Sequence, residues 1–430
     1  MREMKGSGIE WIGQIPKGWE LRRAKTLFTQ RNSKGNGIEV LLSPTQKYGV
    51  VPQSQLEGVV QVKEDTDLQM FKTVHKGDFV ISLRSFQGGF EYSLYEGVCS
   101  PAYQVFYPTS PICDTYYRYL FKSQSFISKM NNLTVGIREG KNIQYVDFAN
   151  SQIPVPPLAE QERIAAFLDA ECAEIDAALE KTRASIEEYK KLKQAVITQA
   201  VTKGVRGDRP MKNSGIEWIG EIPAEWRKTQ LRHCAAIKSG ITLGKKYEKT
   251  DSLVERPYLR VANVQDGYVD LSVLTTIEVT QDEDLKYRLR AGDVLMTEGG
   301  DRDKLGRGCV WHGEIEPCLH QNHIFAVQAS KDTLLPEFLE YLTVSDVGRS
   351  YFDVTAIKTT NLACTSSSKV LAFTIPLPSV EEQAEIVEAL NTKCAGIDAL
   401  VAKKQQYLIE IENYKKSLIY EYVTGKKEIV

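Results

Sequence analysis

Hydrophobic residues three and four positions apart run through two long segments of the chain. Residues 160–203 contain neither Gly nor Pro, and the segment that follows Pro378 repeats the same spacing. This spacing predicts two amphipathic helices, each about 44 residues and roughly 65 Å long. The predicted contact stripe comprises Leu168, Ile175, Leu179, Thr182, Ile186 and Tyr189 in the first helix, and Leu390, Ile397, Val401, Lys404, Leu408 and Ile411 in the second.

The ends and charges of these helices predict how they pair. Ser379 and Glu382 form a capping-box pattern, and Gly204 and Gly425 stand where a helix would stop. Residues 160–180 hold seven acids and one base, whereas residues 181–203 hold two acids and six bases. Antiparallel pairing sets acidic halves against basic halves, so we expect an antiparallel coiled coil. The alternative is two unrelated surface helices, each packed on its own neighbouring segment.

The chain repeats two motifs. SGIEWIGQIPKGW at residues 7–19 recurs as SGIEWIGEIPAEW at 214–226, with ten of thirteen positions identical. IPVPPLAEQERI at 153–164 recurs as IPLPSVEEQAEI at 375–386. Self-similarity of this kind predicts a repeated architecture. The order is therefore module, helix, module, helix, which implies pseudo-twofold symmetry.

The modules between the helices share little besides their outline. Short apolar runs separated by turn residues, followed by helical patterns, predict an α+β class with two α/β modules. Each module has a Gly-Asp pair before an apolar run, Gly77-Asp78 and Gly292-Asp293. The predicted boundaries are residues 1–155 for the first module, 156–204 for the first helix, 205–378 for the second module and 379–425 for the second helix.

Composition narrows the class of protein. No secretory signal and no run of about 18 apolar residues is found, so we expect a cytoplasmic protein with free thiols. The net charge of −2 argues mildly against nucleic acid, but the two helical segments are themselves acidic and leave the remaining chain slightly basic.

Enzyme signatures are missing from the sequence. GxGxxG, GxxxxGK[ST], HExxH and GxSxG are all absent. One alternative stays open, a Mg²⁺-dependent nuclease that would bind its metal with Glu139-Gly140-Lys141 and an upstream acid such as Asp114. Cys309, His312, Cys318, His320 and His323 invite a zinc interpretation, but their spacing is unlike that of paired zinc ligands. We expect no metal, no cofactor and no catalysis, and a coiled-coil adaptor that binds only protein stays open.

The repeated motifs together resemble the specificity (S) subunit of type I restriction–modification complexes. GDVLMTEGGDRDKLGRGCVW at 292–311, HQNHIFAV at 320–327 and KTTNLA at 358–363 add to the resemblance. It implies two target-recognition domains held apart by an antiparallel helical pair, each reading one half of a bipartite, asymmetric site in double-stranded DNA. It further implies two methyltransferase subunits docked on the helices, with restriction subunits joining that core. The first module departs from the second module's motifs, so its assignment depends on the flanking segments.

Polar and basic clusters within the modules are the candidate DNA contacts. Arg suits guanine, Gln and Asn suit adenine, and Lys and Thr suit phosphate. Solvated loops that satisfy their own backbone are the alternative for each cluster. The candidates are Arg84, Ser85, Gln87, Arg138, Lys141 and Gln144 in the first module, and Arg302, Lys304, Arg307, His320, Gln321, Asn322, Lys358, Thr359 and Asn361 in the second.

Overall fold

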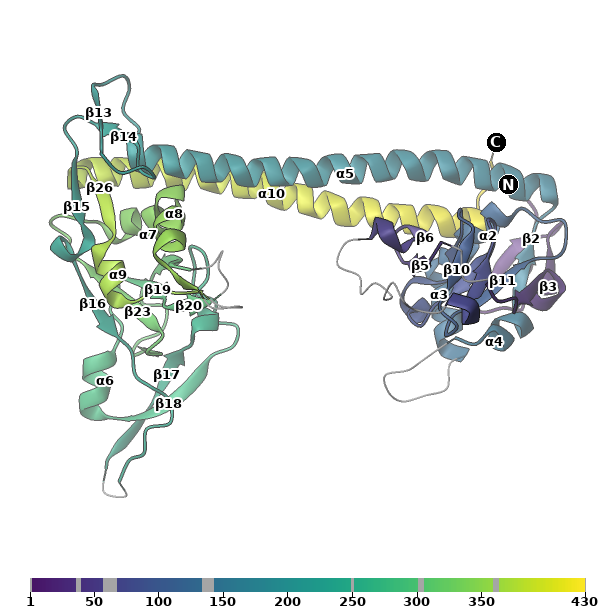
Figure 1. Ribbon diagram of the computed structural model, residues 1–430, viewed down its shortest axis with the longest axis horizontal. Helices are drawn as coiled ribbons and strands as arrows, with labels where there is room; N and C mark the ends of the chain where they lie inside the picture. Colours follow the sequence, from purple (N-terminus) through teal and green to yellow (C-terminus); the bar gives the residue numbers. More distant parts are fainter. Residues whose placement is uncertain are drawn as a thin grey trace. The chain divides into compact units, whose positions relative to one another are not determined.

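A computed structural model describes residues 2–35, 40–56, 68–133, 143–248, 251–300, 305–358 and 363–429. The chain forms two compact units (Figure 1). Unit 1 comprises residues 1–183 with 406–430, and unit 2 comprises residues 184–405. No helix among the described residues is long and apolar enough to cross a membrane.

Two long helices, α5 (Leu158–Lys203) and α10 (Val380–Val423), confirm the helical prediction. The first begins directly after Pro157. Gly204 and Gly425 end them with φ of 75° and 71°, a left-handed conformation that glycine adopts without strain. Leu168, Ile175, Leu179, Ile186 and Leu390 are buried, and the other seven positions of the predicted stripe are half-buried.

The helices are antiparallel within each unit. In unit 1, Lys415 Nζ lies 2.7 Å from Asp176 Oδ1, and Arg183 lies 2.8 Å from Glu412. In unit 2, Lys193 Nζ lies 2.7 Å from Asp398 Oδ2. The first and third pairs occupy equivalent positions of the repeat, 222 residues apart. Each unit therefore repeats the same helix contact with the donor and acceptor helices exchanged.

Unit 1 contains a four-stranded antiparallel sheet in the order β4-β11-β8-β9. Aromatic side chains fill its core, including Phe28, Phe79, Phe106 and Phe121, together with Leu418 of α10. The strands are β1 (Met4–Gly6), β2 (Gln14–Pro16), β3 (Glu20–Arg23), β4 (Phe28–Arg31), β5 (Leu42–Thr45), β6 (Gly49–Pro52), β7 (Lys72–Val74), β8 (Phe79–Ile81), β9 (Glu91–Tyr92), β10 (Gly97–Cys99), β11 (Gln104–Pro108) and β12 (Gln152–Val155). The shorter helices are α1 (Ser85–Gly88), α2 (Asp114–Lys122), α3 (Gln124–Leu133) and α4 (Tyr145–Asn150).

Unit 2 contains the corresponding sheet, in the order β16-β23-β19-β21, and adds a three-stranded sheet β18-β17-β22. Its strands are β13 (Met211–Asn213), β14 (Glu221–Pro223), β15 (Arg227–Gln230), β16 (Ala235–Ser239), β17 (Leu253–Leu259), β18 (Thr275–Thr280), β19 (Asp293–Thr297), β20 (Gly299–Gly300), β21 (Gly308–Val310), β22 (Leu319–His320), β23 (Ile324–Ala329), β24 (Ile357–Lys358), β25 (Ala363–Cys364) and β26 (Thr374–Leu377). Its shorter helices are α6 (Gln281–Tyr287), α7 (Pro336–Val344), α8 (Asp346–Thr355) and α9 (Ser367–Ala372). The α+β class is confirmed.

The repeated Glu-Gln pair at the start of each long helix joins that helix to its module. Trp19 donates from Nε1 to Glu160 at 2.9 Å, and Trp226 donates to Glu382 at 3.0 Å. Gln161 accepts the backbone N–H of Cys113, and Gln383 accepts that of Leu335, at the entrances to α2 and α7. The motif tryptophan and the helix glutamate meet in both units, although they are 141 residues apart in the first half and 156 residues apart in the second.

Candidate nucleic-acid interfaces

The polar motifs of the second module meet at one end of its central sheet. Thr297, at the end of β19, pairs with Ile324, at the start of β23, so residues 298–300 and 321–323 leave the sheet together. Gly299–Gly300 then pairs with β25, which also pairs with β24. The structure thus brings together the Gly-rich segment, the HQNH segment and both flanks of the KTTNLA motif, which are separate in sequence.

Glu298 connects these three segments. Its carboxylate lies 2.5 Å from His323 Nδ1, its backbone N–H donates to His323 O at 2.9 Å, and its carbonyl accepts the Thr365 N–H at 2.7 Å. Three segments held by one residue form a defined platform from which neighbouring side chains can extend.

Of the predicted contacts in this module, Arg307, Gln321 and Asn322 are half-exposed, and Lys358 contributes its backbone to β24. These stay predictions as DNA contacts. Arg302, Lys304, Thr359 and Asn361 lie outside the described residues.

His320 is a correction to the prediction. Its side chain is 1% exposed and its Nδ1 lies 3.0 Å from Ile324 O. Leu259-His320 is a parallel strand pair, which places the imidazole in the interior. The His320 side chain therefore stabilises the 321–323 turn from the interior of the module and does not face solvent.

Burial of His320 predicts a pH dependence of stability. Desolvation lowers its pKa from 6.5 to about 4. Because the unfolded chain binds the proton more readily, the stabilisation is complete above pH 6.5 and is lost as pH falls toward 4. The full change is on the order of 3 kcal/mol, from about 1.4 kcal/mol per pKa unit.

His320→Asn keeps a donor for Ile324 O, so urea unfolding of this variant between pH 7.5 and 4 should show a shallower loss of stability than unfolding of the wild type. The exposed His312→Asn is the matched control; equal slopes for wild type and His320→Asn would contradict the assignment.

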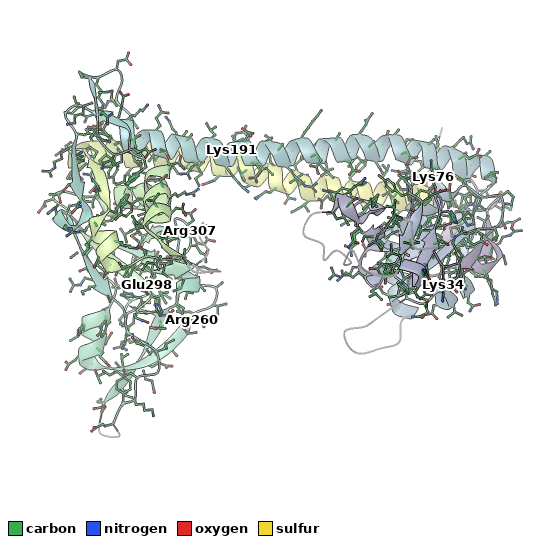
Figure 2. All side chains as sticks on the ribbon, in the orientation of Figure 1. Lys34, Lys76, Lys191, Arg260, Glu298 and Arg307 are labelled. Atoms are coloured by element: carbon green, nitrogen blue, oxygen red, sulfur yellow. The ribbon has the colours of Figure 1, made fainter. Side chains whose placement is uncertain are left out.

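Arg260 is a candidate that the sequence pattern did not single out. It follows β17, its side chain is exposed, and its backbone N–H donates to Asn263 Oδ1 at 2.8 Å. Asn263 is buried and its amide also donates to the Asp270 and Val273 carbonyls, which fixes the turn. Figure 2 shows Arg260, Glu298 and Arg307 along one side of this module. The sequence pattern does not reveal Arg260 because its position depends on the parallel pairing of β17 with β22, which brings residue 260 beside residue 321.

The first module presents its candidates at the equivalent end of its sheet. Ile81, at the end of β8, pairs with Gln104 of β11, and α1 follows immediately. Arg84 and Gln87 are exposed there. Gln144 is exposed and its Oε1 accepts from Gln104 Nε2 at 3.0 Å, so it lies at the same sheet end. Arg138 and Lys141 lie outside the described residues.

Ser85 is the second correction. It is 1% exposed, and its hydroxyl accepts the Ser82 N–H at 2.8 Å. The serine closes the turn between β8 and α1, because its oxygen satisfies a backbone donor that the turn would otherwise leave unpaired. It therefore supports Arg84 and Gln87 rather than extending beside them.

The residues behind the metal and nuclease alternatives are placed as follows. Cys309 and Cys318 are buried, and burial raises the pKa of each thiol to about 12. No group of three His, Cys, Asp or Glu side chains that could hold a metal is found among the described residues. Asp114 begins α2 and accepts the Tyr92 hydroxyl at 2.6 Å, whereas residues 139–141 lie outside the described part of the chain.

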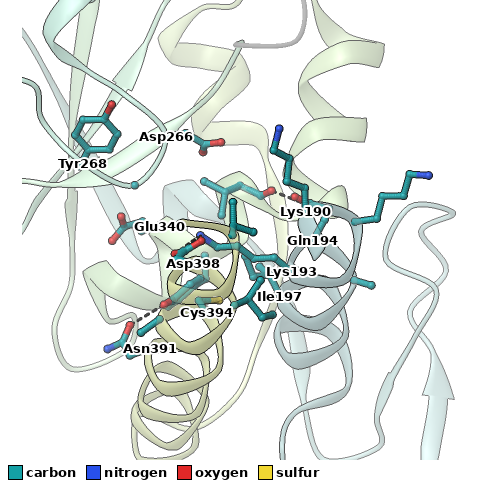
Figure 3. Close-up of a pocket in the computed structure, with 18 of the residues that line it drawn as sticks. Lys190, Lys193, Gln194, Ile197, Asp266, Tyr268, Glu340, Asn391, Cys394 and Asp398 are labelled. Carbon is teal, nitrogen blue, oxygen red and sulfur yellow. Dashed lines mark hydrogen bonds and ion pairs between the residues drawn. The ribbon is translucent and has the colours of Figure 1, made fainter. Parts of the chain in front are cut away.

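Unit 2 also has a groove of about 1180 Å³ where α5, α7 and α10 meet (Figure 3). Lys193 and Asp398 pair within it, and Tyr341 donates to Asn391 at 2.6 Å. Burial, followed by the charge of Glu337, raises the pKa of Glu340 to about 7. The equivalent position in unit 1 is Arg118, which pairs with Asp169. The two helix–module junctions therefore share their packing but differ in charge.

Comparison with known proteins connects this arrangement to one family. Residues 16–188 match the type I restriction modification DNA specificity domain. The EcoKI specificity subunit of Escherichia coli K12 is 26% identical over 329 residues, covering 74% of this chain and 67% of that subunit. The MjaVIII specificity subunit of Methanocaldococcus jannaschii is 28% identical over 300 residues, covering 67% and 65% respectively. The chain thus spans about two thirds of the length of these relatives.

Solved structures share the fold. A chain from a structural study of complex assembly and conformational transition in the type I R-M system matches with a TM-score of 0.70, at 16% identity, over 96% of this chain and 99% of that one. The crystal structure of the HsdS subunit from Thermoanaerobacter tengcongensis matches with a TM-score of 0.52, at 17% identity, over 99% of this chain and all of that one. The chain is therefore similar in sequence to type I restriction enzyme specificity subunits and shares the fold of the HsdS subunit.

Similarity to these specificity subunits connects the two modules, which the motifs alone left unconnected. The matched specificity domain runs from the first repeated motif into α5, so it includes the first module, whose own motifs were the weaker ones. The resemblance based on the second module and the flanking segments is therefore confirmed for the first half of the chain as well.

Proposed function

We propose that this specificity subunit reads a bipartite, asymmetric site in double-stranded DNA, one half-site per module, and catalyses no reaction itself. The observation that carries the proposal is the combination of recurring and divergent parts. The Trp–Glu bond and the Lys–Asp helix pair recur in both units, whereas the polar side chains at the two sheet ends differ. Identical half-sites would call for similar readers, as in symmetric dimers.

The chemistry of the two sheet ends supports DNA as the ligand. Arg260 and Arg307 in the second module and Arg84 in the first can contact guanine edges or phosphates, and the nearby glutamines and asparagine can contact adenine edges. Each group extends from a turn that backbone hydrogen bonds hold in place, so little conformational freedom is lost on binding.

We further propose that the helical pair docks two methyltransferase subunits in the cytoplasm, and that restriction subunits join this core. Large apolar side chains on the helices face solvent in support of this: Leu192 is 48% exposed, Tyr407 47% and Tyr414 54%. Exposed apolar side chains on the helices offer area that a protein partner could remove from water. Methylation and DNA cleavage would then belong to those partners.

Methylome sequencing of cells that express this chain with its methyltransferase tests the proposal. We expect one methylated motif made of two different half-sites separated by an unread gap. A continuous palindrome would contradict it. Absence of any motif, together with no gel shift on pooled genomic fragments, would favour the protein-only adaptor. Cleavage of DNA by the purified chain with added Mg²⁺ would favour the nuclease.

A further inference from the structure

A β-hairpin beside α1 places an additional polar group next to the predicted contacts of the first module. Residues 46–48 join β5 to β6, and all three side chains are exposed. The Thr45 hydroxyl accepts the Tyr48 N–H at 3.0 Å and donates to Gly49 O at 3.0 Å. Gly49 has φ of 72°, and a Cβ there would lie 2.7 Å from Tyr92 O. The hairpin end is therefore fixed in shape and held against β9.

Gln46, at this hairpin end, bonds to Gln87 of α1. Gln46 Nε2 donates to Gln87 Oε1 at 3.3 Å, and the Gln46 carbonyl accepts from Lys122 Nζ at 3.2 Å. Gly88 makes room for the contact, because a Cβ there would lie 2.6 Å from Gln46 Cγ. The two carboxamides thus meet across segments 41 residues apart in sequence, and nothing in the local sequence signals the meeting.

The bonded pair retains hydrogen-bonding capacity on its exposed side. Gln46 keeps its Oε1 and one amide hydrogen, and Gln87 keeps both amide hydrogens. One acceptor beside amide donors matches the N6 donor and N7 acceptor that adenine presents in the major groove. Lys47 and Arg84, both exposed, flank the pair and supply positive charge for phosphates. The hydrogen bond to Tyr48 raises the pKa of Lys47, so it stays protonated.

We infer that Gln46 and Gln87 act as one base-reading element that selects an adenine in the half-site read by the first module. Lys47 strengthens binding to any sequence, and Gly88 is a positioning residue that lets Gln46 lie against α1. This inference rests on the proposed function. It extends the proposed contact surface from α1 to the β5–β6 hairpin, which no sequence motif marks.

Binding of the assembled complex, full chain with its methyltransferase, to the wild-type target tests the inference. The comparison set is a series of DNAs in which each base pair of one half-site is replaced in turn. Gln46→Ala is expected to weaken binding to the wild-type target about 10-fold or more. The same variant should no longer discriminate at one A·T pair, while discrimination at every other position stays as in wild type. Gln46→Ala/Gln87→Ala should lose discrimination at that same pair and no other.

Three further variants separate base reading from other roles. Gly88→Ala should weaken discrimination at the same pair, because the added methyl group displaces Gln46. Lys47→Ala should weaken binding to all sequences alike and reduce the salt slope by about one. Gln14→Ala, an exposed glutamine on β2, should change nothing.

The outcomes distinguish the inference from the proposed function. Wild-type protein that shows no sequence preference overturns both. If the wild-type protein shows a sequence preference and the assembled Gln46→Ala/Gln87→Ala variant discriminates between the DNAs equally well, the inference alone is overturned. Loss of discrimination at one base pair for Gln46→Ala and at a different one for Gln87→Ala alone also overturns it, because the glutamines would then read separately.

Discussion

Replacing Glu382 with Ala should lower the free energy of unfolding of unit 2 by about 3 kcal/mol, because a buried ion pair would lose one partner. Glu382 is 3% exposed and lies 2.6 Å from Arg209, which is 11% exposed. It also accepts the Trp226 indole at 3.0 Å. The variant leaves the Trp226 indole N–H without its acceptor in the interior, where an unpaired group loses its full hydration. It also removes the buried partner of Arg209, which keeps its bonds to Glu225 and the Lys203 carbonyl. Chemical denaturation monitored by tryptophan fluorescence measures the change.

Two comparisons make this test specific. Glu381→Ala removes the neighbouring exposed carboxylate and should cost less than about 0.5 kcal/mol. Glu160→Ala removes the equivalent residue of unit 1, whose pair with Arg2 is more exposed, at 15% and 19%. It should therefore cost less than Glu382→Ala. Equal losses for Glu381→Ala and Glu382→Ala would show that the junction does not depend on this carboxylate.

Inserting four residues after Thr182 and after Lys404 should abolish methylation at the wild-type motif and create a motif with the same half-sites and a longer gap. Both insertions fall within helices that run from one unit into the other. Four residues lengthen a helix by roughly 6 Å, which corresponds to about two base pairs of DNA. The Asp176–Lys415 and Lys193–Asp398 pairs lie on either side of the insertions and are kept.

Methylome sequencing of the insertion variant measures the result. A variant that carries only the insertion after Thr182 is the control, because the unequal helices then lose their register and methylation should fall without a new motif. Half-sites that change while the gap stays constant would contradict the idea that the helices set the spacing.

The helical half of this fold was predictable from the sequence because periodicity acts locally. The stripe from Leu168 to Ile411 follows from spacing, and its positions are buried or half-buried. The Gly stops follow from backbone conformation, and both have positive φ. The antiparallel direction followed from charge, because the first half of each helix is more acidic and the second half is more basic. Each of these signals is contained in a single segment.

The module surfaces were less predictable because exposure there depends on long-range pairing. His320 and Ser85 have side chains typical of DNA contacts, yet β22 pairing with β17 buries the first and the turn after β8 buries the second. Arg260 and Gln46 were missed for the same reason: each lies beside its neighbours only through strands or turns distant in sequence. Composition identifies suitable chemistry, whereas topology decides which side chains face outward.

The exchanged ion pairs of the two units have a consequence for association between molecules. Each long helix carries one aspartate and one lysine at equivalent positions of the repeat. These are Asp176 and Lys193 on α5, and Asp398 and Lys415 on α10. Such a surface is self-complementary, and a second chain could supply α10 as readily as the first, which is the requirement for domain swapping. Covalent linkage favours closure within one chain, because it makes the pairing of the two helices intramolecular. Packing of the long helices in the module cores adds to this preference for closure within one chain.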